Sequence, residues 1–272
     1  MIMLRPMFYH QALLQYDGTG RTGFQAQAGH LTIQGELDHS LQQLLPGGFS
    51  TRAASRTDKG VHAFAQVIKI SAADPTPLSP ELLNRVLPPH MRCLAVLPCP
   101  AEFIPSMDQR TKEYRYLFSS EAGEQRFIAR PRRPVDPAPM QACVAMLRGT
   151  HDFKNFWSIG GVSNTTLRTI DAAELTLVDP TELFRDTLFD AGELRACWQF
   201  RIVGTGFLKH MVRHLMGALW EVGAGVLSVE DFARYLHGEQ KQQRPWRRAD
   251  PHGLYLVKVS YEGPGLGYPL VR

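Results

Sequence analysis

The order of strand and helix patterns constrains the fold of this chain more than any other feature of its sequence. Both halves run in roughly strand, helix, strand, strand order, with short loops between the segments. Strands and helices mixed in this way favour two α/β units, each with a mostly antiparallel sheet. The sequence therefore predicts an α+β protein with two domains, residues 1–105 and 106–272.

The predicted strands show period-two alternation or short apolar runs that end at turn residues. Alternation is strictest over Thr111–Phe118, where Tyr114 and Tyr116 share one face while Glu113 and Arg115 share the other. The predicted strands are Phe8–Tyr16, Gln66–Ile70, Ala95–Leu97, Thr111–Phe118, Ala172–Val178, Arg195–Val203 and Tyr255–Tyr261.

Apolar residues at helical spacing predict the helices. Phe207–Val222 has the clearest apolar stripe, and Ser79-Pro80 is a good helix start, with a capping serine before a proline. The proline-rich stretches 75–80, 131–139 and 245–251 are predicted to be loops. The predicted helices lie between Ile33 and Leu44, from Ser79 to before Pro88, over Met140–Arg148, over Phe207–Val222 and from Ser228 to Gly238.

The charge balance permits a nucleic-acid partner without requiring one. The 272 residues carry a formal net charge of +4, and 44% of them are hydrophobic, as in an ordinary soluble protein. Two basic stretches stand out, Arg130–Arg133 and Lys241–Arg248. They are either solvated loops or phosphate-contacting segments, with Trp246 as a stacking surface in the second interpretation.

The sequence gives no pattern for a metal, a nucleotide cofactor or a membrane. The cysteines Cys93, Cys99, Cys143 and Cys197 form no CxxC pair and no zinc spacing, so they are expected to be reduced thiols. The glycine-rich stretch Gly18–Gly23 matches neither nucleotide-binding motif. No signal peptide and no apolar run of about 18 residues is seen, so we predict a cytoplasmic protein.

Asp58 is the first candidate for chemistry. It lies in Ser55–Ala63, directly before a predicted strand, and Arg56 and Lys59 flank it. A hairpin turn alone would explain Asp-Lys-Gly. A nearby cation, however, keeps an aspartate ionised and suited to nucleophilic attack. His62 either takes part or orients the loop, and a single carboxylate does not suit paired acid–base glycoside hydrolysis.

Three further residues have both a structural and a functional interpretation. Tyr114 is either a core aromatic or a ring that stacks on an extruded base, and Tyr116 points the same way. Arg213 is either a solvated arginine or a partner of Asp58. Gly217, on the same side of its helix, is predicted to allow the close approach of another backbone.

Together these residues resemble the TruA-type family of tRNA pseudouridine synthases, in motifs that follow the family's order through most of the chain. The matching motifs are Tyr16-Asp17-Gly18 with Gly23 and Gln25, Arg56–Ala63 with Gln66-Val67, Asn84 with Leu87-Pro88, Lys112–Tyr116, Gly149 with Asp152-Phe153, Phe207–Arg213 with Gly217, and Gly253–Leu256.

The resemblance implies a pseudouridine synthase fold, in which two RNP-like units are joined across a central RNA-binding cleft. It implies that Asp58 is the nucleophile, Tyr114 stacks on the uracil, Arg213 pairs with Asp58, and Arg56 intrudes into the RNA. The implied reaction converts uridine to pseudouridine at positions 38, 39 and 40 of the tRNA anticodon stem-loop. The implied enzyme is a homodimer that needs no cofactor.

Two departures from the family pattern bear on substrate range. Phe24 stands where the family usually has tryptophan, and Ile104-Pro105-Ser106 stands where it often has a histidine and an arginine. Two other functions remain open at this point. One is an RNA-binding protein without turnover, and the other is a hydrolase that uses Asp58 and His62.

Overall fold

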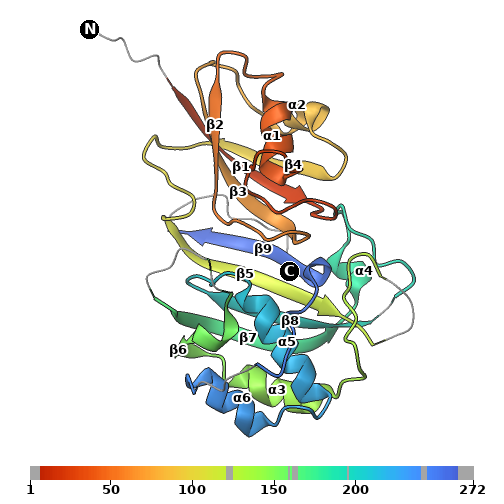
Figure 1. The fold of residues 1–272 in the computed structure, drawn as a ribbon. Coiled ribbons are helices and arrows are strands. Elements are labelled where there is room, and N and C mark those ends of the chain that lie inside the picture. The colour runs from red at the N-terminus through yellow and green to blue at the C-terminus, as the bar shows by residue number, and fades with distance from the viewer. Residues whose placement is uncertain are drawn as a thin grey trace. The chain divides into compact units, whose positions relative to one another are not determined.

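The computed structural model of the chain describes residues 7–120, 125–158, 160, 165–194, 196–239 and 244–262 (Figure 1). It is an α+β protein with few helices, and neighbouring strands pair mostly antiparallel. The predicted fold class is therefore confirmed. The chain forms two compact units, and the described residues 7–110, 186–188 and 256–262 make up the first. The domains predicted at 1–105 and 106–272 stay a prediction.

The first unit is a sheet with the strand order β4-β1-β3-β9, onto which β2 adds by pairing with β3. Helices α1 and α2 cover one face of this sheet (Figure 1). The elements are β1 Phe8–Tyr16, α1 Ile33–Leu41, β2 Phe49–Ala53, β3 His62–Ala72, α2 Pro80–Val86, β4 Met91–Pro98 and β9 Leu254–Tyr261.

Short polar residues start both helices of this unit. The Thr32 side chain accepts a hydrogen bond from the Gly35 N–H at the start of α1. The Ser79 side chain accepts from the Leu82 N–H at the start of α2, with Pro80 in the first turn. Such caps satisfy backbone N–H groups that have no partner inside the helix. The start predicted at Ser79 is confirmed.

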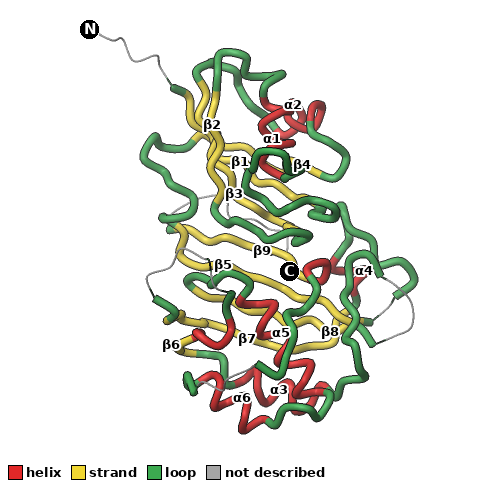
Figure 2. Tube along the Cα trace, viewed as in Figure 1, coloured by secondary structure: helices red, strands yellow, loops and turns green. Residues whose placement is uncertain are grey.

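The second unit contains residues 111–185 and 189–255 and has the strand order β5-β8-β7-β6. Helices α3, α5 and α6 pack against one another, and α3 also packs on β7 (Figure 2). The elements are β5 Gln109–Phe118, α3 Pro137–Ala145, β6 Gly149–Asp152, β7 Leu167–Val178, α4 Pro180–Leu183, β8 Cys197–Gly204, α5 Met211–Gly223, α6 Val229–Leu236 and the 3-10 helices Phe153–Phe156 and Pro251–Gly253.

Helix α5 begins later than its apolar pattern predicts. His210 lies in the left-handed region with φ 62°, so the helical hydrogen bonds cannot run back to Phe207. The rest of the predicted stripe is confirmed, because Met211, Leu215 and Leu219 are each at most 1% exposed. Because of this left-handed residue, the segment before His210 does not continue the helix α5.

Several short elements escaped the sequence analysis. Strands β2 and β6 and helix α4 were not predicted, and α3 begins inside the stretch 131–139 predicted as a loop. Asp136 caps α3 and Asp179 caps α4, each with a proline in the first turn. The predicted start of β8 at Arg195 lies outside the described residues. Within the described ranges, no helix has the length and apolar character needed to cross a membrane.

Candidate functional site

The loop that carries Asp58 connects β2 to β3 and is fixed on both sides of the carboxylate. The Asp58 carbonyl accepts a hydrogen bond from the Val61 N–H at 3.1 Å. The Thr57 carbonyl accepts one from the Phe24 N–H at 3.0 Å, and the Thr57 hydroxyl lies 2.7 Å from the Tyr16 hydroxyl. Asp58 is half-buried. Its carboxylate is therefore partly exposed, on a loop whose backbone is held by hydrogen bonds.

Gln66 clamps the beginning of the same loop. Its side-chain amide donates to the Ser55 carbonyl at 2.6 Å and accepts from the Ser55 N–H at 3.1 Å. Gln66 is fully buried, so this pair of hydrogen bonds is shielded from water. From the sequence, Gln66 was expected at the start of a strand and beside the Arg56–Ala63 motif, but its side chain was given no role. A lone amide before the apolar run Val67-Ile68 was the available signal.

The glycine-rich turn after β1 packs directly against the Asp58 loop. A side chain at Gly18 would place its Cβ 2.1 Å from the Val61 carbonyl oxygen, so only glycine fits there. The fully buried His62 has its Nδ1 3.1 Å from the Gly18 N–H nitrogen and 3.1 Å from Asp17 Oδ1.

The hydrogen bonds around Asp17 tie this turn together. Burial raises the pKa of Asp17, but hydrogen bonds from His62 and Thr19 outweigh it and hold the pKa below its usual value. His62 is thus occupied within the protein and orients the turn, as one of its two interpretations expected. A hydrolase that uses His62 as an exposed base does not fit this burial. Arg56 and Lys59, in contrast, are exposed.

Tyr114 and Tyr116 lie on the same face of β5 but in different surroundings. Tyr116 is fully buried, its hydroxyl donates to the Asp250 carbonyl at 2.7 Å, and its ring contacts Trp220. Burial raises the pKa of Tyr116 well above its usual value, with Asp250 adding to the rise. Tyr114 is 8% exposed and meets Phe207 edge-on, with ring centroids 5.1 Å apart. Tyr116 is therefore a core residue.

The opposite face of β5 carries an ion-pair network. Glu113 bonds Arg115 at 2.9 Å and Arg201 of β8 at 3.0 Å, and Arg115 also donates to Gln199 at 3.3 Å. Burial raises the pKa of Glu113, but Arg201 and Arg115 outweigh it and lower the pKa. These contacts hold the Arg115 guanidinium to its own sheet. Lys112 lies on the Tyr114 face, and burial lowers its pKa to about 8.

Arg213 lies in the first turn of α5 and is 7% exposed, so it is not the solvated arginine of the structural interpretation. Its Nε donates to the Ala249 carbonyl at 2.8 Å, and its own carbonyl accepts from the Ala249 N–H at 3.0 Å. A Cβ at Gly217 would lie 1.9 Å from the Arg247 carbonyl oxygen, which confirms the predicted close approach. Helix α5 therefore grips residues 247–249 at two points.

Trp246 is a core residue rather than a surface for stacking bases. It is 5% exposed, its ring stacks on Phe156 at 5.2 Å, and Tyr235 meets it edge-on at 4.8 Å. The sequence interpretation of Trp246 as an RNA-stacking residue is wrong. Burial of this large aromatic ring stabilises the folded protein. The part of the basic stretch before Arg244 lies outside the described residues.

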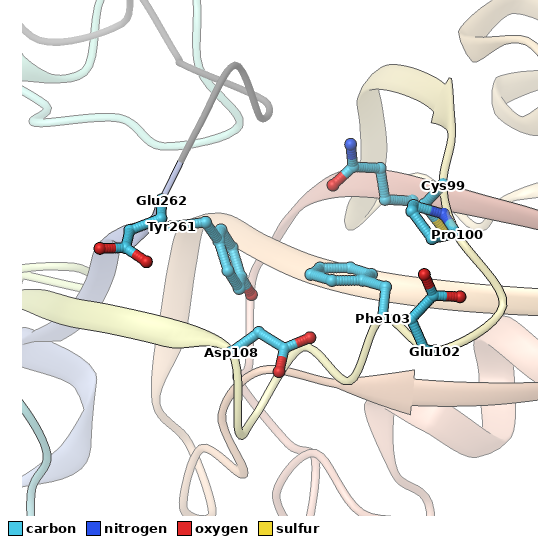
Figure 3. Close-up of a pocket in the computed structure, with 8 residues that line it drawn as sticks. Cys99, Pro100, Glu102, Phe103, Asp108, Tyr261 and Glu262 are labelled. Atoms are coloured by element: carbon cyan, nitrogen blue, oxygen red, sulfur yellow. The ribbon is translucent and has the colours of Figure 1, made fainter.

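A cavity of about 310 Å³ in the first unit lies where Ile104-Pro105-Ser106 departs from the family pattern (Figure 3). The rings of Phe103 and Tyr261 meet there with centroids 5.2 Å apart, and the Tyr261 hydroxyl donates to the Pro105 carbonyl at 2.9 Å. Three carboxylates, those of Glu102, Asp108 and Glu262, line the cavity. Because these anions repel phosphate, the cavity does not suit an RNA backbone.

Phe24, the other departure, is a packing residue. It is 1% exposed, and its ring lies 6.1 Å from the ring of Tyr16.

The four cysteines are free thiols, and burial raises the pKa of Cys93, Cys143 and Cys197 to about 12. The described residues contain no group of three or more histidine, cysteine, aspartate or glutamate side chains placed to hold a metal ion.

His214 makes the stability of the protein depend on pH. Burial, together with the charges of Arg244, Arg248, His210 and Arg213, lowers its pKa to about 3. The unfolded chain therefore binds a proton that the folded chain rejects, and stability falls as the pH drops from about 6.5 towards 3. We expect the free energy of unfolding, measured with urea, to fall by about 1–3 kcal/mol between pH 7 and pH 4.5 because of this residue.

The matched variant for this prediction is His214→Gln, which removes the titrating group while other histidines stay in place. Its free energy of unfolding should fall less steeply over the same pH range than that of the unaltered protein. Equal slopes for the two proteins would show that His214 is not held neutral by its surroundings.

Comparison with known proteins relates this chain to tRNA pseudouridine synthases. A family model described as tRNA pseudouridine synthase matches residues 143–262. The chain is 34% identical over 255 residues to tRNA pseudouridine synthase A of Geobacter sp. (strain M21), covering 92% of this chain and 97% of that protein. Over 253 residues it is 34% identical to the Chlorobaculum tepidum protein of the same name, covering 91% and 96%. The Neisseria gonorrhoeae protein of that name is 33% identical over 266 residues, covering 95% and 93%.

Proposed function

This chain belongs to the tRNA pseudouridine synthase A family, and we propose that it isomerises uridine to pseudouridine at positions 38, 39 and 40 of the tRNA anticodon stem-loop. The nucleophile in this proposal is Asp58. The observation that carries it is the anchored loop, which holds one partly exposed carboxylate between fixed neighbours. Preorganisation of this kind is what a nucleophile needs, because no reorganisation is then required during reaction.

The chemistry is a redistribution within one nucleotide. The bond from ribose C1′ to uracil N1 breaks, and a bond from C1′ to uracil C5 forms. The proton on C5 leaves, and N1 gains one, so the atoms and electrons balance without an oxidant or reductant. The base must leave the RNA stack before this happens, which costs a few kcal/mol.

Tyr114 is the proposed platform for the detached uracil. Its ring is held edge-on by Phe207, while Tyr116 is committed to the core, and this contrast supports the choice between them. A ring that stacks on the base keeps it in the pocket while it turns. Arg56, which is exposed beside Asp58, is proposed to enter the RNA and help extrude the base.

Replacing Tyr114 separates the roles of its ring and its hydroxyl. Tyr114→Phe keeps the ring, so we expect KM within about twofold of the unaltered protein and kcat lower by about fivefold, the value of one hydrogen bond. Tyr114→Leu loses stacking worth about 1–3 kcal/mol and should raise KM by about 5–150-fold. Steady-state kinetics with unmodified tRNA would measure both, and an unchanged KM for Tyr114→Leu would contradict the stacking role.

Arg213 is the proposed partner of Asp58. The two residues belong to different units, so their pairing stays a prediction. The support is the family resemblance. Such a pair would keep the aspartate ionised at neutral pH.

The proposal also includes a tRNA partner, which the names of the relatives support. It includes a homodimer as well, which the family resemblance implies, and a cytoplasmic location. Light scattering of the purified protein tests the dimer. The site of modification is tested with unmodified tRNA transcripts that carry uridine at only one of positions 38, 39 and 40. Pseudouridine at each of these positions would support the proposal, whereas tight binding without pseudouridine would favour an RNA-binding protein without turnover.

A further inference from the structure

Basic side chains gather at the start of α5, in a group here named the α5 basic cluster. A guanidinium nitrogen of Arg248 donates to His210 Nδ1 at 2.5 Å. Burial, together with the charges of Arg248, Arg213 and Lys209, lowers the pKa of His210 to about 4. The members of the cluster are Lys209, His210, Arg213, His214, Arg244 and Arg248.

Three cations of this cluster have no ion-pair partner among the residues that the structure describes. Among the described residues, no ion pair joins an acidic side chain to Lys209, Arg244 or Arg248. Asp250, next along the chain, makes no ion pair there either, and the first turn of α5 has no acidic residue. Like charges held this close repel one another, so the arrangement costs stability unless an anion joins it.

The backbone under the cluster is held firmly in place. Arg213 binds both the N–H and the carbonyl of Ala249, and Trp246 is stacked in the core. His214 Nε2 lies 3.0 Å from the Ser158 hydroxyl, and Arg244 donates to the Lys154 carbonyl at 3.5 Å. The residues beneath the exposed side chains of the cluster are therefore held in place by these contacts.

Two members of the cluster remain at the surface. Lys209 and Arg248 are exposed, whereas Arg213 and His214 are 7% and 8% exposed. Arg248 is positioned by a neutral imidazole, which occupies one nitrogen of its guanidinium. The charges of both Arg248 and Lys209 act on the His210 imidazole. A planar guanidinium together with an ammonium suits a phosphate group, which takes paired hydrogen bonds from arginine and a point charge from lysine.

We propose that Lys209 and Arg248 form a subsite for a backbone phosphate of the RNA, with His210 positioning Arg248. This inference rests on the proposed function, since it takes its occupant from the tRNA substrate. The buried part of the same cluster includes Arg213, the proposed partner of the nucleophile. The subsite would therefore hold the RNA strand next to that arginine. It also gives a role to the end of the basic stretch Lys241–Arg248 that the sequence left open.

The test is the salt dependence of tRNA binding, measured by fluorescence anisotropy with labelled, unmodified tRNA between about 50 and 300 mM salt. Arg248→Gln and Lys209→Gln should each weaken binding about five- to tenfold at low salt and reduce the slope of log Kd against log salt by about 0.7–0.9. Arg248→Lys should restore the slope but only part of the affinity. In steady-state kinetics, the loss should appear in KM more than in kcat, because a phosphate contact binds the RNA equally in the ground state and the transition state.

The matched control is Arg234→Gln on α6, where the arginine is exposed and paired with Asp231 at 3.4 Å. It removes one charge from the same unit outside the cluster and should leave the slope unchanged. Slopes and affinities equal to the control for both cluster variants would overturn the subsite. Reduced slopes in a protein that forms no pseudouridine would overturn the proposed function and leave the subsite standing.

Discussion

Asp58→Asn is expected to abolish pseudouridine formation, with a loss of more than about 10³-fold in kcat, because the amide is not a nucleophile. The fold should survive the change. The contacts that fix the loop come from the Asp58 carbonyl, Thr57 and Gln66, and none of these needs the Asp58 carboxylate. Thermal unfolding and tRNA affinity should therefore stay close to those of the unaltered protein.

Two controls make this result specific. Glu102→Gln removes a carboxylate of the first unit that lines the cavity, whose lining includes no residue of the Asp58 loop, and its kcat should not change. Lys59→Gln removes the exposed cation directly beside Asp58 and should affect tRNA binding more than kcat. Wild-type turnover by Asp58→Asn would show that the nucleophile has been assigned to the wrong residue.

Arg213→Gln is expected to lower kcat by about 10²–10³-fold, as removal of one preorganised charge from an active site does. The reason is that an aspartate without a cationic partner is more easily protonated and less well oriented. Arg213 also donates to the Ala249 carbonyl, so the variant should lose about 1–3 kcal/mol of stability from the unsatisfied buried group. Single-turnover kinetics would measure the rate, and urea unfolding the stability.

Arg213→Lys separates the charge from the geometry. A lysine keeps the positive charge, so kcat should recover to within about tenfold of the unaltered protein if charge is what matters. A rate for Arg213→Gln equal to that of the unaltered protein would mean that Arg213 serves only to hold residues 247–249. In that case, the stability loss would remain without a catalytic effect.

The sequence predicted long, strongly patterned elements better than short ones. Strand β1 has the bounds that its pattern predicts, and the Ser79 cap marks α2 correctly. Strand β2 escaped because a five-residue edge strand shows too little alternation to be distinguished from a loop. Helix α5 begins four residues late because the left-handed His210 is a backbone conformation that apolar spacing does not reveal.

Around the candidate site, sequence motifs located the residues but not their surroundings. The alternation of β5 gave Tyr114 and Tyr116 equal standing, and only burial and the Asp250 contact separate them. Trp246 looked like a surface aromatic because basic residues surround it in sequence, yet it packs against Tyr235 of α6 and against Phe156, which is far away in sequence. Contacts between residues far apart in sequence decide such cases, and local pattern contains no information about them.

The most direct test of the central claim is tritium release from unmodified tRNA labelled at carbon 5 of uridine, with Asp58→Asn as the comparison. Isomerisation frees the C5 hydrogen, so the unaltered protein should release tritium from anticodon-arm uridines and the variant should release none above background. Absence of release by the unaltered protein, while it binds the tRNA tightly, would contradict the assignment as a uridine isomerase.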